Sequence, residues 1–392
     1  MTFRIPFSGR AHYYSDEEIA VVINAMQTAD PLTQGHFRTN FESSFSSYIG
    51  VDHSFAVCNA TAALEMAAQL CQFEDGDEVI IPSHTFTSSA YPFAKWGAKI
   101  VWADIDLQTR VVTASTIAER LSEHTKALVV PHLYGYCADM PAIMDLAENK
   151  GLIVIEDAAQ SLGTEVDGHK SGSFGDLGIF SFHSHKNITT LGEGGMLTVK
   201  NKSFAEIIPM LRHNGHCGFG FDREDYWLPA MGNLDFPLIN GAPLWPSNYC
   251  LGEVECALGT KLLERLDAIN EQKRRRAIAF IDRMSDFPEL RFHRVDSPRH
   301  NYHLLTAMLT NGKRDEFIRK MAAEKQIQCV VQYYPLNRYP LYDRLGFSKA
   351  DCPNADFFFD NMVSFPFHHW LSDTDATYMI DATSEILRAL RK

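Results

Sequence analysis

The sequence predicts an α/β fold with a mostly parallel central sheet and a small C-terminal α+β domain. Three observations lead to this prediction. Short apolar segments alternate with amphipathic stretches from residue 55 to residue 155, most of those segments are apolar at every position, and the last part of the chain mixes strand and helix patterns. Strands without a polar face are typical of parallel sheets that helices cover on both sides. We place the large domain at 1–260 and the small one at 261–392.

Two helical patterns open the chain, over residues 16–30 and 37–49, and acidic residues occupy the first turn of the earlier one. Strands and helices then alternate, because apolar runs of strand length are separated by longer amphipathic stretches. The predicted strands are 55–58, 79–82, 99–103, 127–132 and 152–155, and the predicted helices are 59–72, one ending near 96, 114–123 and 139–149.

The second half of the chain begins with a pair of strands. Residues 178–183 and 196–199 are largely apolar and flank the Gly-rich turn 192–195. A short helix follows, and then a long stretch without periodicity, 213–247; such stretches are more often functional than not. The remaining predicted elements are helices over 203–212, 251–284, 314–324 and 374–390, and strands over 304–309 and near 330.

The composition argues against several classes of protein. A net charge of −13 disfavours a nucleic-acid partner, which usually binds a basic stripe. No apolar run reaches the roughly 20 residues that span a membrane, and the N-terminus lacks the apolar core of a signal peptide. The eight cysteines have no CxxC spacing, which favours reduced thiols in the cytoplasm. We expect no metal site, because His183 and His185 alternate with period two and would point to opposite faces of a strand.

Lys186 is the first candidate catalytic residue. It lies between the predicted strand 178–183 and the Gly-rich turn, where two apolar strands meet. Desolvation lowers the pKa of an amine and makes it a nucleophile, as a Schiff base with an aldehyde cofactor requires. The local pattern alone favours an ordinary surface lysine beside a hairpin, so the other candidate residues decide.

Four further features would complete a cofactor site. Small residues and Thr61 at the start of the helix over 59–72 leave backbone N–H groups free for an anion, although the same pattern also describes a plain helix cap. Asp157 ends one predicted strand and Phe86 follows another, and both fall at the edge where parallel sheets bind ligands. Ser181 shortly precedes the candidate lysine.

A site for pyridoxal 5'-phosphate needs this set of groups. A lysine binds the aldehyde, a carboxylate keeps the ring nitrogen protonated so that the ring accepts electrons, an aromatic side chain stacks on the ring, and a helix N-terminus holds the phosphate. At about 3 Å and an effective dielectric constant near 20, the carboxylate and the ring nitrogen attract each other by several kcal/mol. The residues therefore predict a pyridoxal-phosphate enzyme.

Seven stretches carry a resemblance to a known family. They are LTQG (32–35), NATAAL (59–64), PSHTFTSSA (82–90), HLYGYCADM (132–140), IEDAAQSLG (155–163), FGDLGIFSFHSHKNITTLGEGGML (174–197) and SNYCLGEVECALG (247–259). Together they resemble the sugar aminotransferases of the DegT/DnrJ/EryC1/StrS family over nearly the whole chain. The resemblance implies the fold of aspartate aminotransferase, a pyridoxal-phosphate-dependent transferase fold.

The resemblance implies roles around the cofactor ring. Lys186 would be the Schiff-base lysine and the proton shuttle, and Asp157 would pair with the ring nitrogen. Gln160 would hydrogen-bond near the ring hydroxyl, and Phe86 would stack on the ring. His183 matches an aromatic or histidine position of the family near the lysine, where structural support and catalysis both remain open.

The resemblance also implies how the phosphate is held. Thr61, the backbone of Ala62 and Ser181 would bind it from within one chain. Asn248 matches an asparagine that, in this family, reaches the phosphate from the partner subunit. A homodimer with its sites at the interface is therefore expected.

Two departures from the family pattern concern the substrate. The family usually has Asn-Tyr-Arg where this chain has Asn-Tyr-Cys, ending at Cys250, and an arginine is a rigid fork for carboxylates and phosphates. The segment 216–247 is longer than the usual connection in the family, so we expect it to shape an unusual substrate pocket.

The resemblance implies an aminotransferase that moves an amino group from L-glutamate to a keto sugar for surface polysaccharide or lipopolysaccharide. Within the family, the sequence most resembles the branch that forms 8-amino-3,8-dideoxy-octulosonate (8-amino-Kdo). Three alternatives stay open: a nucleotide-linked 3- or 4-keto-6-deoxy sugar as acceptor, a pyridoxal-phosphate sugar dehydratase, and a non-catalytic regulator that binds the cofactor or a sugar. Family dehydratases have histidine in place of the lysine, so Lys186 argues for amino transfer.

Overall fold

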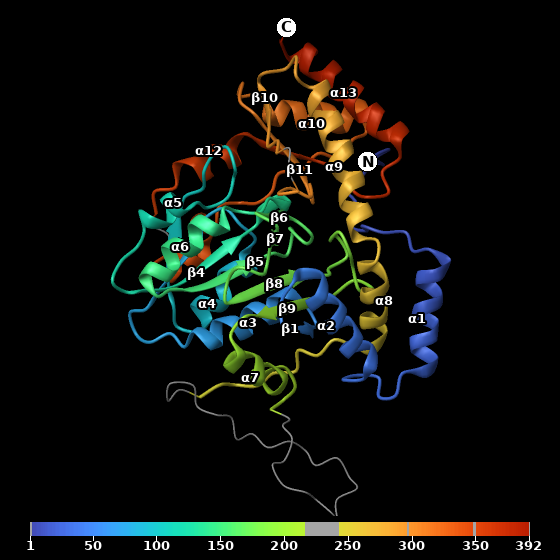
Figure 1. The fold of residues 1–392 in the computed structure, drawn as a ribbon. Helices are drawn as coiled ribbons and strands as arrows, with labels where there is room; N and C mark the ends of the chain where they lie inside the picture. The colour runs from blue at the N-terminus through green and yellow to red at the C-terminus, as the bar shows by residue number, and fades with distance from the viewer. Residues whose placement is uncertain (1, 216–242, 296–297, 348–349, 392) are drawn as a thin grey trace, which may run out of the picture.

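The computed structural model describes residues 2–215, 243–295, 298–347 and 350–391. Its centre is a seven-stranded sheet in the order β1-β9-β8-β5-β4-β2-β3 (Figure 1). β9 (Gly195–Val199) is antiparallel to both of its neighbours, β1 and β8, and the other neighbouring pairs are parallel. The predicted mostly parallel sheet is confirmed. The other strands of this sheet are β1 (His53–Val57), β2 (Glu78–Pro82), β3 (Lys99–Ala103), β4 (Thr125–Pro131), β5 (Ile153–Asp157) and β8 (Leu177–Ser181).

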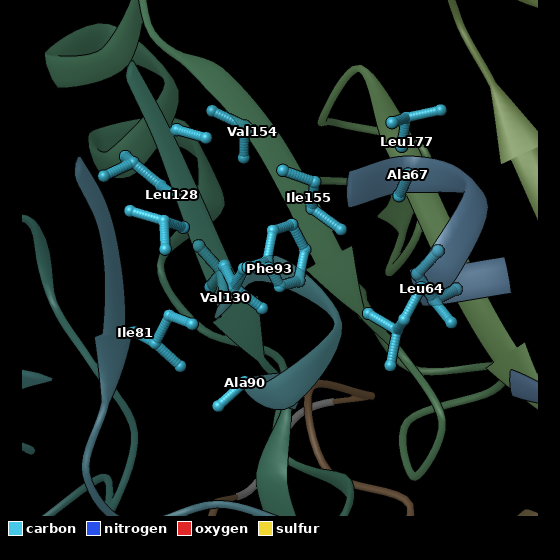
Figure 2. Packing of buried hydrophobic residues seen from close by; sticks show 14 of the residues in the cluster. Leu64, Ala67, Ile81, Ala90, Phe93, Leu128, Val130, Val154, Ile155 and Leu177 are labelled. Carbon is cyan, nitrogen blue, oxygen red and sulfur yellow. The ribbon is translucent and has the colours of Figure 1, made fainter. Parts of the chain in front are cut away.

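The strands lie close to their predicted positions because their apolar residues are buried on both faces of the sheet. β2 and β9, for example, are buried at every position. Leu64 and Ala67 of α3 and Phe93 of α4 pack against sheet residues such as Val130 and Ile155 (Figure 2). The helices of this region are α1 (Asp16–Thr28), α2 (His36–Ile49), α3 (Ala60–Cys71), α4 (Tyr91–Lys95), α5 (Ala114–Ala118), α6 (Met140–Lys150) and α7 (Lys202–Arg212).

A second, three-stranded sheet forms the C-terminal part, in the order β10-β11-β12 and antiparallel throughout. α10 and α13 accompany it in a separate apolar core (Figure 1). The division at residue 260 stays a prediction. The elements are α8 (Glu253–Leu263), α9 (Leu266–Arg283), β10 (Leu290–Phe292), β11 (Leu305–Leu309), α10 (Arg314–Lys325), α11 (Pro340–Arg344), α12 (Pro353–Asn361), β12 (Met362–Phe365) and α13 (Asp373–Arg391).

Some predicted elements are wrong in extent. The single helix over 251–284 is two helices that separate at Glu264 and Arg265, where Arg265 turns to form an ion pair with Glu18 of α1 (2.6 Å). The helix over 114–123 ends at Ala118. The strand near 330 is one isolated bridge between Val330 and Ser364. The segment 216–242, which makes up most of the predicted substrate loop, lies outside the described residues.

The two sheets are joined by a buried cation. Arg110, between β3 and α5, donates hydrogen bonds to the Thr306 carbonyl (3.0 Å) and hydroxyl (2.8 Å) and to the Arg291 carbonyl (2.9 Å). Burial lowers the pKa of Arg110 to about 10. Because two carbonyls and a hydroxyl accept hydrogen bonds from it, this guanidinium is buried with no acid partner among the described residues.

No helix in the described part of the chain is long and apolar enough to cross a membrane.

A buried carboxylate fixes the ends of three strands. Glu156 accepts backbone N–H bonds from Gly172 (2.8 Å), Phe174 (2.7 Å) and Gly175 (2.7 Å), in the loop before β8. Its second oxygen also accepts from Nε2 of His132, just after β4 (2.9 Å). Both side chains are fully buried. The network holds β4, β5 and the approach to β8 in one arrangement.

We predict that Glu156→Ala lowers the free energy of unfolding by about 3 kcal/mol or more, because three buried N–H donors and a buried histidine lose their acceptor. Urea unfolding of the variant and the wild-type protein measures this difference. Glu123→Ala, at an exposed carboxylate, is the control and should change the value by less than about 0.5 kcal/mol. Equal effects of the two substitutions would contradict the structural role of Glu156.

Candidate active site

A cavity of about 700 Å³ opens at the carboxyl ends of the parallel strands. Pro131, Asp157 and Ser181, the last residues of β4, β5 and β8, all line it. This is the edge at which open α/β sheets bind ligands. The cavity thus lies where the sequence analysis expects the cofactor.

The N-terminus of α3 forms one end of this cavity. Asn59 caps the helix by accepting a hydrogen bond from the Ala62 N–H (2.9 Å). The N–H groups of Ala60 and Thr61 lie in the first turn of α3, so they have no acceptor within the helix. Both residues line the cavity. The Thr61 hydroxyl lies 3.0 Å from that of Ser88. Free N–H donors, hydroxyl groups and the positive end of the helix dipole suit a phosphate.

Gly195 at the start of β9 allows the sheet to approach this helix end. A Cβ atom there would lie 2.6 Å from the carbonyl carbon of Asn59 and 2.7 Å from the nitrogen of Ala60. Any other residue would therefore push α3 away from the sheet. Gly195, the last residue of the Gly-rich turn, is thus needed for this close approach.

Asp157 is held as a carboxylate in the cavity wall. It is 9% exposed and accepts hydrogen bonds from the Ser89 hydroxyl (2.6 Å) and the Ala159 N–H (3.2 Å). Ser89 belongs to the same short segment as Phe86, and Phe86 lines the cavity. The two donors orient the carboxylate in the cavity wall.

Lys186 lies in the 182–194 connection between β8 and β9. Its backbone N–H donates to the His183 carbonyl (2.8 Å), which makes a tight turn, and the residue lines the cavity. Desolvation lowers the pKa of the Lys186 amine to about 8, and the Asp157 carboxylate acts in the opposite direction. An amine with this pKa is partly neutral near pH 7 and able to act as a nucleophile.

Aromatic residues and an amide line the side of the cavity near Phe86. Gln160 accepts from the Tyr134 N–H (2.8 Å) and donates to the Tyr333 hydroxyl (3.2 Å). Phe86 is 49% exposed, and its ring meets that of Tyr333 edge to face at 5.7 Å. Tyr333 was not anticipated from the sequence, because nothing near it in the chain indicates a site.

The structure brings most of the predicted site residues to one cavity. Six line it: Thr61, Phe86, Asp157, Gln160, Ser181 and Lys186. Ala62 does not line the cavity, and its N–H already donates to Asn59. Asn248 is exposed and does not line the cavity either. The roles of all eight residues remain predictions. Asn248 is the residue expected to serve the partner subunit, and that expectation stays a prediction.

The expected divergence of His183 and His185 is wrong. Their rings lie 4.9 Å apart in a T-shaped arrangement. β8 ends at Ser181, and the chain turns before the histidines, so strand alternation does not apply to them. Nε2 of His183 lies 3.7 Å from a carboxylate oxygen of Glu193.

The residues present fit pyridoxal phosphate. The free N–H groups of α3 suit the phosphate, the Asp157 side chain lines the cavity and can pair with a ring nitrogen, and Lys186 offers an amine whose pKa is lowered to about 8. No other described part of the chain combines these three groups. The donor set is thus that of the cofactor expected from the sequence.

Comparison with known proteins agrees with this geometry. The family model described as "DegT/DnrJ/EryC1/StrS aminotransferase family" matches residues 13–384. The chain is 32% identical to the spore coat polysaccharide biosynthesis protein SpsC of Bacillus subtilis, over 99% of this chain and 97% of that one. It is also 32% identical to a GDP-perosamine synthase of Caulobacter vibrioides, over 93% and 94% of the two chains.

A solved structure shows the same fold. The PMP form of the putative sugar aminotransferase Spr1654 from Streptococcus pneumoniae superposes with a TM-score of 0.86, at 24% identity, over 99% of this chain and all of that one. The same enzyme is also known in a PLP form. The chain belongs to the DegT/DnrJ/EryC1/StrS aminotransferase family, a family of pyridoxal-phosphate-dependent enzymes.

Proposed function

We propose that this protein transfers an amino group from L-glutamate to a keto sugar used in surface polysaccharide or lipopolysaccharide biosynthesis. The observation that carries the proposal is that Lys186, Asp157 and the free N-terminus of α3 share one cavity. Two relatives support the class of acceptor, since one is named for spore coat polysaccharide and the other for GDP-perosamine. The lysine favours amino transfer over the dehydratase alternative.

The residues divide the work in the following way. Bound pyridoxal phosphate supplies an aldehyde that carries the amino group and a ring that accepts electrons. Thr61, with the first turn of α3 and Ser181, would hold the phosphate, and Asp157 would keep a proton on the ring nitrogen. Lys186 would hold the cofactor, and its amine would take the proton from the donor's Cα.

The partner subunit completes the site in this proposal. Asn248 is exposed in the single chain and would contact the phosphate bound by the other subunit. The active form is therefore proposed to be a homodimer, acting in the cytoplasm.

Cys250 stands where the family usually has arginine. Its Sγ lies 3.6 Å from the Arg212 carbonyl.

The acceptor sugar divides the proposal into two versions. The preferred version forms 8-amino-3,8-dideoxy-octulosonate, and it rests on the resemblance to that branch of the family. The second version aminates a nucleotide-linked 3- or 4-keto-6-deoxy sugar, and the relatedness to GDP-perosamine synthase favours it. Assays of each keto sugar with glutamate decide between them: the acceptor that yields an amino sugar identifies the version that holds.

The first test of the proposal is the visible absorbance of the cofactor-loaded protein before and after L-glutamate is added. We expect the yellow colour to bleach and 2-oxoglutarate to appear in equal amount. Colour that glutamate leaves unchanged would refute glutamate as the donor. A protein that stays colourless in the presence of pyridoxal phosphate would refute the central proposal.

We predict that Lys186→Ala lowers the steady-state rate by at least about 10³-fold, because the variant lacks both the nucleophile and the proton carrier. The rate of amino-sugar formation measures the loss. Lys320→Ala, at a lysine paired with Glu324 on the surface of α10, is the matched control and should keep the wild-type rate. Steady-state turnover by the Lys186 variant would show that the scheme is wrong.

The lowered pKa of Lys186 predicts how cofactor capture depends on pH. Only the neutral amine reacts, and its fraction rises as the pH rises through the pKa, so the rate should reach half of its maximum near pH 8 instead of the usual 10.5. The growth of visible absorbance after mixing with pyridoxal phosphate, between about pH 6 and 10, measures this rate.

Asp157→Asn tests the cause of this pH dependence. The carboxylate raises the pKa of the amine, so its removal should move the midpoint to lower pH. An unchanged midpoint in the variant, or a wild-type midpoint above pH 10, would contradict the electrostatic account of the site.

A further inference from the structure

A second lysine in the cavity has no acidic partner. Lys273 of α9 lines the cavity and is 4% exposed. Its amine donates to the Asn187 side-chain oxygen (3.1 Å) and the His303 carbonyl (2.9 Å), and no described carboxylate forms an ion pair with it. A buried ammonium group whose contacts are all neutral is costly unless a charge of opposite sign approaches it.

Histidines with unused ring nitrogens accompany Lys273 in the cavity wall. His368 has no hydrogen-bond partner on either ring nitrogen among the described residues, although both nitrogens are buried. One ring nitrogen of His12 and one of His369 are also buried without a partner. The His12 and His369 rings lie 6.1 Å apart; burial lowers the pKa of both, and the nearby Lys273 contributes to the lowering. Native proteins rarely leave so many buried polar atoms unpaired.

The charge of the cavity wall is unbalanced on this side. Among the described acidic residues, only Asp157 and Glu193 line the cavity. Asp157 is held by Ser89 and Ala159, and Glu193 lies beside His183. Neither pairs with Lys273, so a ligand's carboxylate is the charge that would balance a protonated Lys273 on this side of the cavity.

We propose that Lys273 and His368, with His12, His303 and His369, form a subsite that binds a carboxylate of the substrate. A carboxylate accepts hydrogen bonds from an ammonium and from imidazole N–H groups, and such charge-assisted bonds are strong in a site shielded from water. The subsite lies beside the reactive lysine, because Asn187 follows Lys186 in the chain and His12 bonds the Lys186 carbonyl through Nε2 (3.3 Å).

Two substrates of the proposed reaction could supply the carboxylate. Only this choice of substrates rests on the proposed function. L-Glutamate carries carboxylates, and an octulosonate acceptor carries one as well. The two substrates occupy the same cavity in turn, so we expect the subsite to serve both. A nucleotide-linked 3- or 4-keto-6-deoxy sugar carries no carboxylate and would leave the subsite to the amino donor alone.

The test measures binding of carboxylate probes to the cofactor-loaded protein by titration calorimetry. Glutarate represents the donor, D-gluconate represents a sugar acid, and D-sorbitol is the neutral counterpart of gluconate. We expect the wild-type protein to prefer gluconate over sorbitol, and Lys273→Met to weaken glutarate and gluconate about tenfold or more. Lys320→Met, at the lysine of α10 that pairs with Glu324, is the control and should bind like the wild type.

A second variant separates binding from folding. His368→Phe keeps a ring stacked on Trp370, where the two rings lie 3.6 Å apart, but removes both unpaired nitrogens. It should also weaken the carboxylates and leave sorbitol unchanged. If Lys273→Met fails to fold, His368→Phe alone decides.

The outcomes distinguish the sources of the carboxylate. Weakening of glutarate alone assigns the subsite to the donor, weakening of gluconate alone assigns it to the acceptor, and weakening of both confirms shared use. Variants that bind both probes like the wild type overturn the proposal, as does a wild-type protein that binds neither carboxylate. Binding needs no turnover, so a protein that binds the probes through Lys273 without transferring an amine would refute the proposed function and retain the subsite.

Discussion

The burial of Glu156 is the constraint on which the site depends. Its carboxylate pairs with His132 and with three backbone N–H groups before β8, so the ends of β4, β5 and β8 cannot shift independently. Adjacent residues of a strand point to opposite faces. When Glu156 is fixed inside the protein, Asp157 must face the other way, into the cavity. The position of the cofactor carboxylate is therefore set by its neighbour in the sequence.

The strands of the central sheet and the start of α3 could be predicted from the sequence, because local residue patterns determine them. The strands are buried on both faces and so appear as apolar runs, and α3 starts with small residues whose N–H groups stay free. Contacts between distant segments could not be predicted from the sequence: those of Ser89 with Asp157, Tyr333 with Gln160, and Lys273 with Asn187. No local pattern reports such pairs. The break between α8 and α9 was also missed, because neither glycine nor proline marks it.

The two lysines of the cavity, the half-buried Lys186 and the buried Lys273, differ in their charged neighbours. Lys186 has the Asp157 carboxylate nearby, which moderates the fall of its pKa to about 8. Within the part of the chain that the structure describes, Lys273 has only neutral partners, and burial lowers its pKa to about 7. In this arrangement, the lysine near the carboxylate belongs to the cofactor end. Lys273 belongs to the proposed carboxylate subsite. There a ligand's carboxylate would stabilise the protonated amine and raise its pKa.

The start of the chain links the reactive loop to the C-terminal part. The Ala11 N–H donates to the Ser184 carbonyl (2.9 Å) in the loop that carries Lys186. The indole N–H of Trp370 donates to the Arg10 carbonyl (2.8 Å), and the Phe7 N–H donates to the Gln328 side chain (2.9 Å). This segment thus closes the cavity by holding the lysine loop against residues more than 140 positions away in sequence. A shift of the C-terminal part would be passed through it to Lys186, so the geometry of the reactive amine depends on the packing of both sheets.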